Sequence, residues 1–209
     1  MQYPLIQIEI QHQQRLFIPD PEKVKFIYEQ QLAKDPLTPF PFWAKIWASS
    51  TALSGFLKAH PNWVQGKSVL EIGAGIGLPS FTIAQLASNV LISDHAIEAV
   101  ELMQKNIAYL NSNNIQAACL DWNHFPNQIK ADTVLLSDIN YAPEQFESLL
   151  HLLKKFIEEG STIILATPQR IMGGPFIASL QTFIQETHIC SVKENEQAIE
   201  ISILLLRSK

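Results

Sequence analysis

From residue 67 onward, short apolar runs alternate with longer amphipathic stretches. The apolar runs predict strands near 68–72, 89–93, 115–120, 132–137 and 161–166. The amphipathic stretches predict helices near 79–87, 96–111 and 143–158. Strands joined through helices pair in parallel, and right-handed crossovers bring their C-terminal ends to one edge of the sheet. The pattern therefore predicts a doubly wound α/β fold that binds its ligand at that edge.

The two ends of the chain follow a different pattern. Two apolar runs, near 188–194 and 198–206, flank Glu194-Asn195-Glu196 and predict an antiparallel pair. Residues 4–18 alternate polar and apolar side chains, which predicts a β-hairpin with one covered face. A helix should follow, opened by Asp20-Pro21 and closed by Asp35-Pro36. We therefore divide the chain into an N-terminal extension, residues 1–40, and a main domain, residues 41–209.

A proline-rich connection joins these two parts. Pro36, Pro39 and Pro41 should make it stiff and lead Trp43 and Trp47 toward the core. The next helix is expected to run to Ala59, with its N-cap oxygen supplied from the segment 49–51, Ser-Ser-Thr.

A glycine-rich turn follows the first strand of the main domain. After the apolar run 69–72, Gly73, Gly75 and Gly77 occur at G-x-G-x-G spacing, and Pro79 fits the first turn of a helix. Glycine lacks the Cβ atom that would block a ligand or disfavour a positive φ. The turn is typical of a loop whose backbone approaches a ligand, although a plain strand-to-helix turn has the same pattern.

The spacing of this turn discriminates between nucleotide ligands. The dinucleotide motif needs a third glycine where this chain has Leu78, and the phosphate loop needs a lysine that is absent. Glu71 lies two residues before Gly73, and a carboxylate there would repel a pyrophosphate but attract an amino group. Asp94 ends the next strand, about twenty residues later, as expected for a carboxylate that binds ribose hydroxyls. These features favour a nucleoside cofactor with an amino-acid-like end.

Four successive motifs resemble those of class I S-adenosylmethionine-dependent methyltransferases. They are Glu71 through Gly77, then Asp94, then Leu120-Asp121-Trp122, and then Asp132 through Tyr141. Within that superfamily, the chain resembles the protein-lysine methyltransferases that include the enzyme modifying the electron-transfer flavoprotein β subunit. The features that carry this narrower likeness are Pro41-Phe42-Trp43-Ala44, Trp47, residues 120–122 and Asp138-Ile139-Asn140-Tyr141. The likeness covers about residues 40–166 and is weaker at both ends.

The resemblance implies a Rossmann-like, mostly parallel seven-stranded sheet with an antiparallel last strand, and S-adenosylmethionine as the cofactor. Glu71 and the 73–77 backbone would hold its amino-acid end, Asp94 its ribose, and Asp121 with Trp122 its adenine. The cofactor-binding residues expected on this basis are Trp47, Glu71, Gly73, Ala74, Gly75, Gly77, Asp94, Asp121, Trp122 and Ser137. For Trp47 and Trp122, a purely structural place in the core is the alternative.

Asp138 and Tyr141 are the expected catalytic residues. The resemblance places this D-x-x-Y element beside the channel for a lysine acceptor. A lysine ammonium has no lone pair, and its pKa of about 10.4 must effectively fall before it attacks. Asp138 could orient the amine, and the Tyr141 ring could stabilise a partial cation. In the alternative interpretation, Asp138 is an ordinary turn residue and Asn140-Tyr141-Ala142-Pro143 only leads into the next helix.

Composition limits the classes of function. The chain has 209 residues, 47% of them hydrophobic, and a formal charge of −5, so one α/β domain without a nucleic-acid-binding surface is expected. Cys119 and Cys190 form no metal motif, and we expect buried, reduced thiols in a cytoplasmic protein. We expect neither a membrane segment nor a metal site.

The sequence leaves the acceptor open. A protein lysine is favoured by Trp47 and by the Asp138 and Tyr141 pair. A small-molecule N-methyltransferase with a nicotinamide-like acceptor would share the cofactor half of the site. A cofactor-binding module without turnover is the third possibility, and the intact acids at 71, 94 and 138 count against it. The flexible-looking segment 167–175 is expected to shape the acceptor site or to be a simple connector, and the oligomeric state is not predicted.

Overall fold

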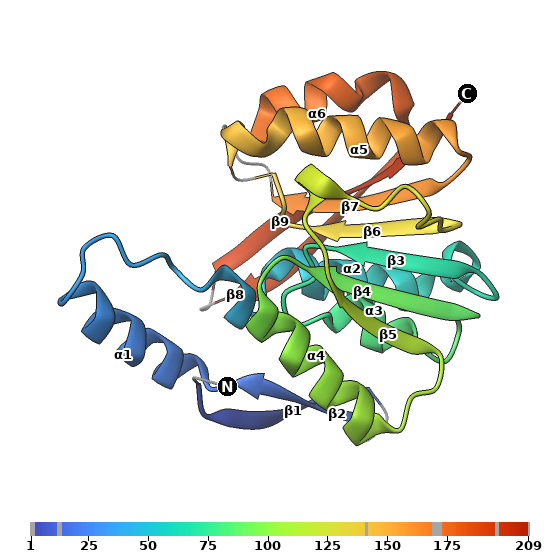
Figure 1. Ribbon diagram of the computed structural model, residues 1–209. Coiled ribbons are helices and arrows are strands. Elements are labelled where there is room, and N and C mark those ends of the chain that lie inside the picture. The colour runs from blue at the N-terminus through green and yellow to red at the C-terminus, as the bar shows by residue number, and fades with distance from the viewer. Residues whose placement is uncertain (1–2, 12–13, 141, 169–172, 195–196, 209) are drawn as a thin grey trace.

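The computed structural model describes residues 3–11, 14–140, 142–168, 173–194 and 197–208. Its centre is a seven-stranded sheet, with a separate two-stranded hairpin beside it (Figure 1). The strands are β1 (Leu5–Gln11), β2 (Gln14–Pro19), β3 (Ser68–Ile72), β4 (Asn89–Asp94), β5 (Ile115–Cys119), β6 (Thr133–Ser137), β7 (Thr162–Pro168), β8 (Ile184–Glu194) and β9 (Gln197–Leu206). The α-helices are α1 (Pro21–Leu32), α2 (Ala48–Ala59), α3 (Leu78–Ile83), α4 (Ile97–Leu110), α5 (Phe146–Glu158) and α6 (Gly174–Leu180). Short 3-10 helices occur at Phe42–Ala44, Pro61–Trp63, Trp122–His124, Pro143–Gln145 and Gln181–Phe183.

The order of strands in the large sheet is β5-β4-β3-β6-β7-β9-β8. The first five of these pair in parallel, whereas β9 is antiparallel to both β7 and β8. The predicted Rossmann-like sheet with an antiparallel last strand is therefore confirmed. From β3 the chain adds β4 and β5 on one side of the sheet and then adds β6 and β7 on the other side. The C-terminal ends of β3, β4 and β6 therefore surround the point where the strand order reverses.

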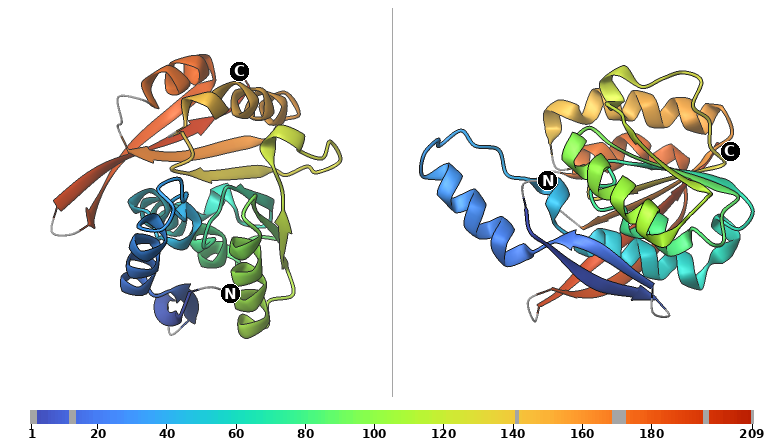
Figure 2. Two further views of the ribbon diagram at one scale, coloured as in Figure 1. Left: turned by 60° about the vertical axis from the view of Figure 1, so that its left-hand side comes forward. Right: turned by 60° about the horizontal axis from the view of Figure 1, so that its bottom comes forward.

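Alternation along the buried strands creates two apolar layers. Leu135 of β6 packs toward α2, α3 and α4, and its neighbours Val134 and Leu136 pack toward α5 and α6. Figure 1 shows α5 and α6 together on one side of the sheet, and Figure 2 shows the same layers from two other directions. Both faces of the central strands are thus covered, which explains their continuous apolar sequence.

The N-terminal hairpin is attached to the main core. Leu16 and Ile18 are buried in the same cluster as the side chains of α2, α3 and α4. Asn106 of α4 is fully buried, accepts a hydrogen bond from the Phe17 backbone N–H at 2.8 Å and donates one to the Phe17 carbonyl at 2.9 Å. The hairpin is therefore fixed to the domain through both apolar burial and a paired backbone contact.

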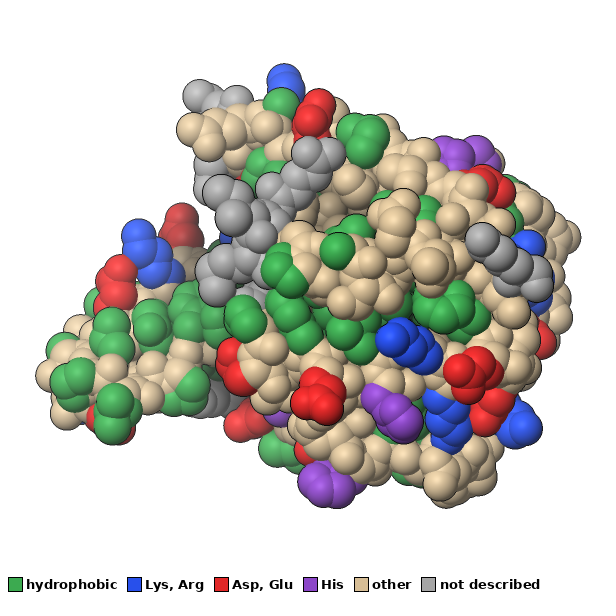
Figure 3. Space-filling model, turned by 90° about the horizontal axis from the view of Figure 1, so that it is seen from above, with side chains coloured by type: hydrophobic (Ala, Val, Ile, Leu, Met, Phe, Trp, Pro, Cys, Tyr) green, Lys and Arg blue, Asp and Glu red, His purple; other side chains and the backbone are tan. Residues whose placement is uncertain are grey.

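The helix that follows is much less enclosed. Asp20 caps α1 by accepting hydrogen bonds from Glu22 and Lys23, as the sequence predicts, but α1 ends at Leu32, before the expected Asp35-Pro36. Along α1, which is described throughout, Val24 is the buried side chain, whereas Phe26 is 58% exposed. Figure 3 shows hydrophobic side chains exposed along the part of the N-terminal extension that projects from the domain.

Two local expectations are wrong. The segment 49–51 does not cap α2, because the helix begins at Ala48 with Trp47 at the N-cap and no side-chain cap; Ser50 instead donates to the Trp47 carbonyl at 2.8 Å. Cys119 is exposed rather than buried, because it ends the edge strand β5, and Cys190 is half-buried; both thiols are free. No helix in the described part of the chain is long and apolar enough to cross a membrane.

Candidate active site

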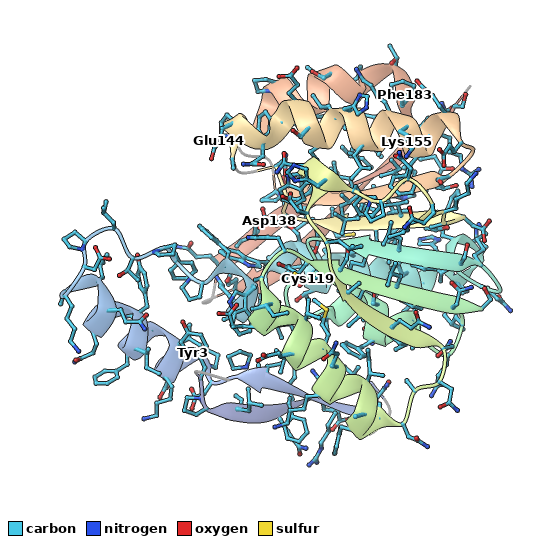
Figure 4. The ribbon with its side chains drawn as sticks, in the orientation of Figure 1. Tyr3, Cys119, Asp138, Glu144, Lys155 and Phe183 are labelled. Carbon is cyan, nitrogen blue, oxygen red and sulfur yellow. The ribbon has the colours of Figure 1, made fainter. Side chains whose placement is uncertain are left out.

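A cavity of about 660 Å³ lies at the carboxyl edge of the sheet, where the strand order reverses. Its floor comes from the ends of β3, β4 and β6 and from the residues that follow them. Its cover, defined here as residues 38–47, comes from the connection between the N-terminal extension and α2. Figure 4 shows Asp138 at this edge, on the side facing the N-terminal extension.

The glycine turn after β3 forms the centre of the floor. Gly73, Gly75 and Gly77 have φ values of 63°, 56° and 77°, a region in which side chains other than glycine are strained. A Cβ atom on Gly75 would also lie 3.1 Å from the carbonyl oxygen of Trp43. The turn thus requires glycine both for its own geometry and for the close approach of the cover.

Asp94 connects the turn to the next element. One of its carboxylate oxygens accepts from the Gly75 N–H at 2.8 Å, and the other accepts from the Ala96 N–H at 2.9 Å. The carboxylate is 5% exposed and lines the cavity. Because each oxygen has a second lone pair, Asp94 can hold the turn and still accept from a ligand hydroxyl.

Glu71 occupies a different place from the one expected. Alternation along β3 turns its side chain away from the Leu70 and Ile72 layer, so it lies beneath the turn, is fully buried and does not line the cavity. Its carboxylate accepts from the Ser80 N–H at 3.0 Å, and burial raises the pKa of Glu71 to about 7. In this structure Glu71 fixes the start of α3 and does not face the cavity.

Of the neighbouring residues Asp121 and Trp122, only Trp122 lines the cavity. Trp122 lines the cavity, and its indole N–H donates to Gln145 at 3.0 Å. Asp121 faces solvent as the N-cap of the Trp122–His124 helix, and the N–H of Asn123 holds the pKa of Asp121 below its usual value. The ring of Trp122 is therefore available to a planar ligand group, whereas the carboxylate of Asp121 is engaged in the cap.

Asp138 lies immediately after β6, in the left-handed region, with φ 57°. Its N–H donates to the Ala166 carbonyl at 2.9 Å, and the residue is 9% exposed and lines the cavity together with Ser137. The following turn is held by a buried hydrogen bond from Thr167 to Asn140 at 2.7 Å. A non-glycine residue with positive φ at a cavity wall is unusual and identifies Asp138 as a functional candidate.

The cover is rich in aromatic rings. Phe40 contacts Phe42, whose ring stacks on Trp47 with centroids 6.0 Å apart, and the Trp47 indole donates to the Phe42 carbonyl at 2.9 Å. Trp43 packs on Tyr3, near the start of the hairpin. The extension thereby supports the wall opposite the glycine turn.

The structure thus brings eight of the predicted residues to one cavity. They are Trp47, Gly73, Ala74, Gly75, Asp94, Trp122, Ser137 and Asp138. Glu71, Gly77 and Asp121 lie next to it without lining it, and Tyr141 lies outside the described residues, as do residues 169–172 of the segment 167–175. Sequence reasoning did not identify Tyr3, Gln31, Phe40 or Phe42 as wall residues, although the cluster of aromatic side chains in 40–47 was a usable signal.

The charges on the wall suit a cationic ligand. Asp94, Glu98 and Asp138 line the cavity with Lys45 and His95, so carboxylates outnumber bases among its described lining residues. A nucleoside that carries a sulfonium and an ammonium group fits this wall, the Trp122 ring and the glycine backbone. No group of three potential metal ligands occurs among the residues that the structure describes.

Comparison with known proteins gives an independent result. The model of a family described as lysine methyltransferase matches residues 42–187. The histone-arginine methyltransferase METTL23 of Homo sapiens is 31% identical over 111 residues, which are 50% of this chain and 58% of that protein. The protein N-lysine methyltransferase METTL21A of Danio rerio is 33% identical over 129 residues, 58% of each protein. The chain spans about half the length of the curated relatives it matches.

A solved structure supports the fold. The N-methyltransferase NodS from Bradyrhizobium japonicum, in complex with S-adenosyl-L-homocysteine, has a TM-score of 0.63 with this chain. The match covers 86% of this chain and 98% of NodS at 12% sequence identity, so it is evidence for a shared fold alone.

Proposed function

Because the chain belongs to the lysine methyltransferase family, we propose that it transfers a methyl group from S-adenosylmethionine to a nitrogen atom of a protein side chain, a lysine in the first place. The observation that carries this proposal is that the glycine turn, Asp94, Trp122 and Asp138 line one and the same cavity. Among the relatives, METTL21A is named as a lysine enzyme and METTL23 as an arginine enzyme, so the acceptor requires a direct test.

The floor of the cavity would hold the cofactor. The backbone of the 73–77 turn would receive its amino-acid end, Asp94 would accept from its ribose, and the Trp122 ring would lie against its adenine. Glu71 would contribute indirectly, because its hydrogen bond from the Ser80 N–H holds the start of α3 in place after the turn. When bound, the cofactor supplies an electrophilic methyl group on a sulfonium.

Transfer to nitrogen requires alignment more than acid–base chemistry. The acceptor nitrogen must present its lone pair in line with the carbon–sulfur bond, and water must be excluded. Asp138, on the cavity wall at the end of a buried strand, would orient the acceptor amine, whose proton passes to solvent. Tyr141, three residues on, is proposed as the second channel residue. A cytoplasmic location is proposed as well, supported by the two free cysteines.

The decisive experiment uses labelled cofactor. The protein is incubated with methyl-labelled S-adenosylmethionine and cell lysate, and any labelled polypeptide is hydrolysed to determine whether methyl-lysine or methyl-arginine has formed. Methyl-lysine supports the proposal, methyl-arginine assigns the other acceptor, and a labelled small molecule indicates a nicotinamide-like acceptor. Calorimetry that detects no binding of S-adenosylmethionine or its demethylated product would refute all of these.

Asp138→Asn tests the catalytic assignment. Asparagine tolerates the left-handed backbone at this position better than alanine, so the substitution removes the charge with little strain. We expect transfer to fall by at least about a hundredfold while cofactor affinity changes only a few-fold. Glu158→Gln, on an exposed side chain at the end of α5 that does not line the cavity, is the control for loss of one carboxylate charge and should retain turnover. Unchanged turnover in Asp138→Asn would remove this role.

A further inference from the structure

A second, smaller hollow adjoins the cavity. This side pocket has a volume of about 160 Å³ and shares two wall residues, Trp47 and Asp138, with the main cavity. Ile199 and Ile201 of β9 give it an apolar wall, and Glu194, at the end of β8, adds a second carboxylate. No basic side chain lines it among the residues that the structure describes. An apolar wall with acids suits an aliphatic side chain that ends in a positive charge.

One ammonium group of the chain already contacts two of the side-pocket residues, Glu194 and Trp47. Lys45 lines the main cavity, and its Nζ lies 2.6 Å from a carboxylate oxygen of Glu194 and 4.3 Å from the centre of the Trp47 ring. The side chains of Lys45 and Glu194 are 40% and 26% exposed, so both are accessible to solvent. The ammonium therefore contacts the ring of Trp47, which lines both hollows, and the carboxylate of Glu194, which lines the side pocket.

We propose that Glu194 and the Trp47 ring form the ammonium-recognition subsite for the acceptor lysine, and that Lys45 occupies this subsite until the acceptor displaces it. The inference rests on the proposed function and adds to it the group that selects the acceptor. A carboxylate binds an alkylammonium by a charge-assisted hydrogen bond, and an indole face binds it by a cation–π contact. Asp138 and Trp47 line both hollows. An ammonium group bound in the subsite would therefore lie near Asp138, the residue proposed to orient it.

A purely structural ion pair would behave differently. If Lys45 and Glu194 only connected the cover to the β8–β9 pair, removing either partner would disturb the site in the same direction. In the proposed subsite the two substitutions act in opposite directions, because Lys45 competes with the acceptor and Glu194 binds it.

The binding test does not require turnover. The probe is n-butylammonium, which copies the end of a lysine side chain, with n-butanol as the neutral control. The signal is the NMR resonance of the Trp47 indole N–H, identified by its absence in Trp47→Phe. We expect a saturable shift in Lys45→Ala at a concentration about fivefold lower than in the wild type, and no saturable shift in Lys45→Ala/Glu194→Gln. Butanol should cause neither shift.

The kinetic test uses the labelled polypeptide acceptor. Lys45→Ala should lower its KM by up to about fivefold and Glu194→Gln should raise it by a similar factor, with kcat nearly constant. Glu194→Asp should restore part of the affinity. The exposed pair Lys25–Glu29 on α1 provides matched controls, since Lys25→Ala and Glu29→Gln should leave KM unchanged.

Two results would overturn the subsite. One is a shift of KM in the same direction for Lys45→Ala and Glu194→Gln; the other is n-butylammonium binding that does not depend on Glu194. Because the probe experiment needs neither cofactor nor transfer, its failure is distinct from a failure of the proposed methyltransferase activity, which the labelling and calorimetry detect.

Discussion

The floor and the cover of the cavity are built by different means. In the floor, hydrogen bonds join segments far apart in the sequence: Ala74 donates to the Ser93 carbonyl at 3.0 Å and Gly75 donates to Asp94 at 2.8 Å. In the cover, the backbone bonds are local, as from Phe42 to Phe40 at 2.9 Å, and Phe42 is 45% exposed. Regions with few buried contacts and local hydrogen bonds open at low free energy. The floor is therefore preorganised, whereas the cover is the part that can adapt to ligands.

The largest expected effect comes from adding a single methyl group to the floor. Gly75→Ala forces a side chain into the left-handed region and against the Trp43 carbonyl, which should cost about 2–3 kcal/mol of unfolding free energy. Cofactor affinity should fall about tenfold or more. Gly55→Ala, in α2 with open space around it, is the matched control and should gain roughly 0.5–1 kcal/mol. Denaturant titration and calorimetry check both, and equal behaviour of the two variants would contradict the distinction.

The support of the cover is tested next. Asn106→Ala leaves the Phe17 N–H and carbonyl without their side-chain partner and should cost about 2 kcal/mol of unfolding free energy. Because Tyr3 beside the hairpin supports Trp43, cofactor affinity should fall as well. Asn89→Ala, an exposed asparagine at the start of β4, should change stability by less than about 0.5 kcal/mol. If Asn106→Ala is as stable as Asn89→Ala, the hairpin is not fixed in this way.

The pH dependence of stability tests the buried acid under the floor. Folded Glu71, with a pKa of about 7 against an ordinary value of 4.5, retains a proton that the unfolded chain has already released. The free energy of unfolding should therefore fall as the pH rises from about 4.5 to 7, and this stabilisation should be absent at pH 8. Glu71→Gln should remove the slope and gain about 1–2 kcal/mol at pH 8. Denaturant titrations at pH 5.5 and 8 measure this, and an unchanged slope would show that another group is responsible.

The smallest effect on stability is expected in the cover itself. Phe42→Ala removes a ring that is about half-exposed but contacts two other rings, so the free energy of unfolding should fall by only about 0.5–1 kcal/mol. Cofactor affinity should nevertheless fall a few-fold, because the ring contacts Phe40 and Trp47 at the cavity wall. Leu37→Ser, on a side chain that is 88% exposed and does not line the cavity, should change neither quantity. Equal affinity in both variants would remove the cover from the binding site.

The sequence by itself determined the sheet and the floor of the cavity. The apolar runs and the crossover rule located the strands. The glycine spacing located the turn, and Asp94 followed from its place at the end of the next strand, because each of these signals is a short local pattern in the chain. The family match to residues 42–187 agrees with the resemblance stated from those motifs. The positions of Glu71 and Asp121 relative to the cavity were beyond such reasoning, because one residue of alternation or a local cap turns a carboxylate away from the ligand.

Only the tertiary structure decided what covers the floor. The approach of Trp43 to Gly75, the packing of Tyr3 on Trp43 and the ion pair between Lys45 and Glu194 join segments 30 to 150 residues apart in the chain. Such contacts depend on how helices, strands and loops pack against one another, and they cannot be predicted from hydrophobic periodicity along the chain. For the same physical reason, the glycine turn and Asp94 could be located from sequence motifs, whereas the ion pair beside the cavity required the folded molecule.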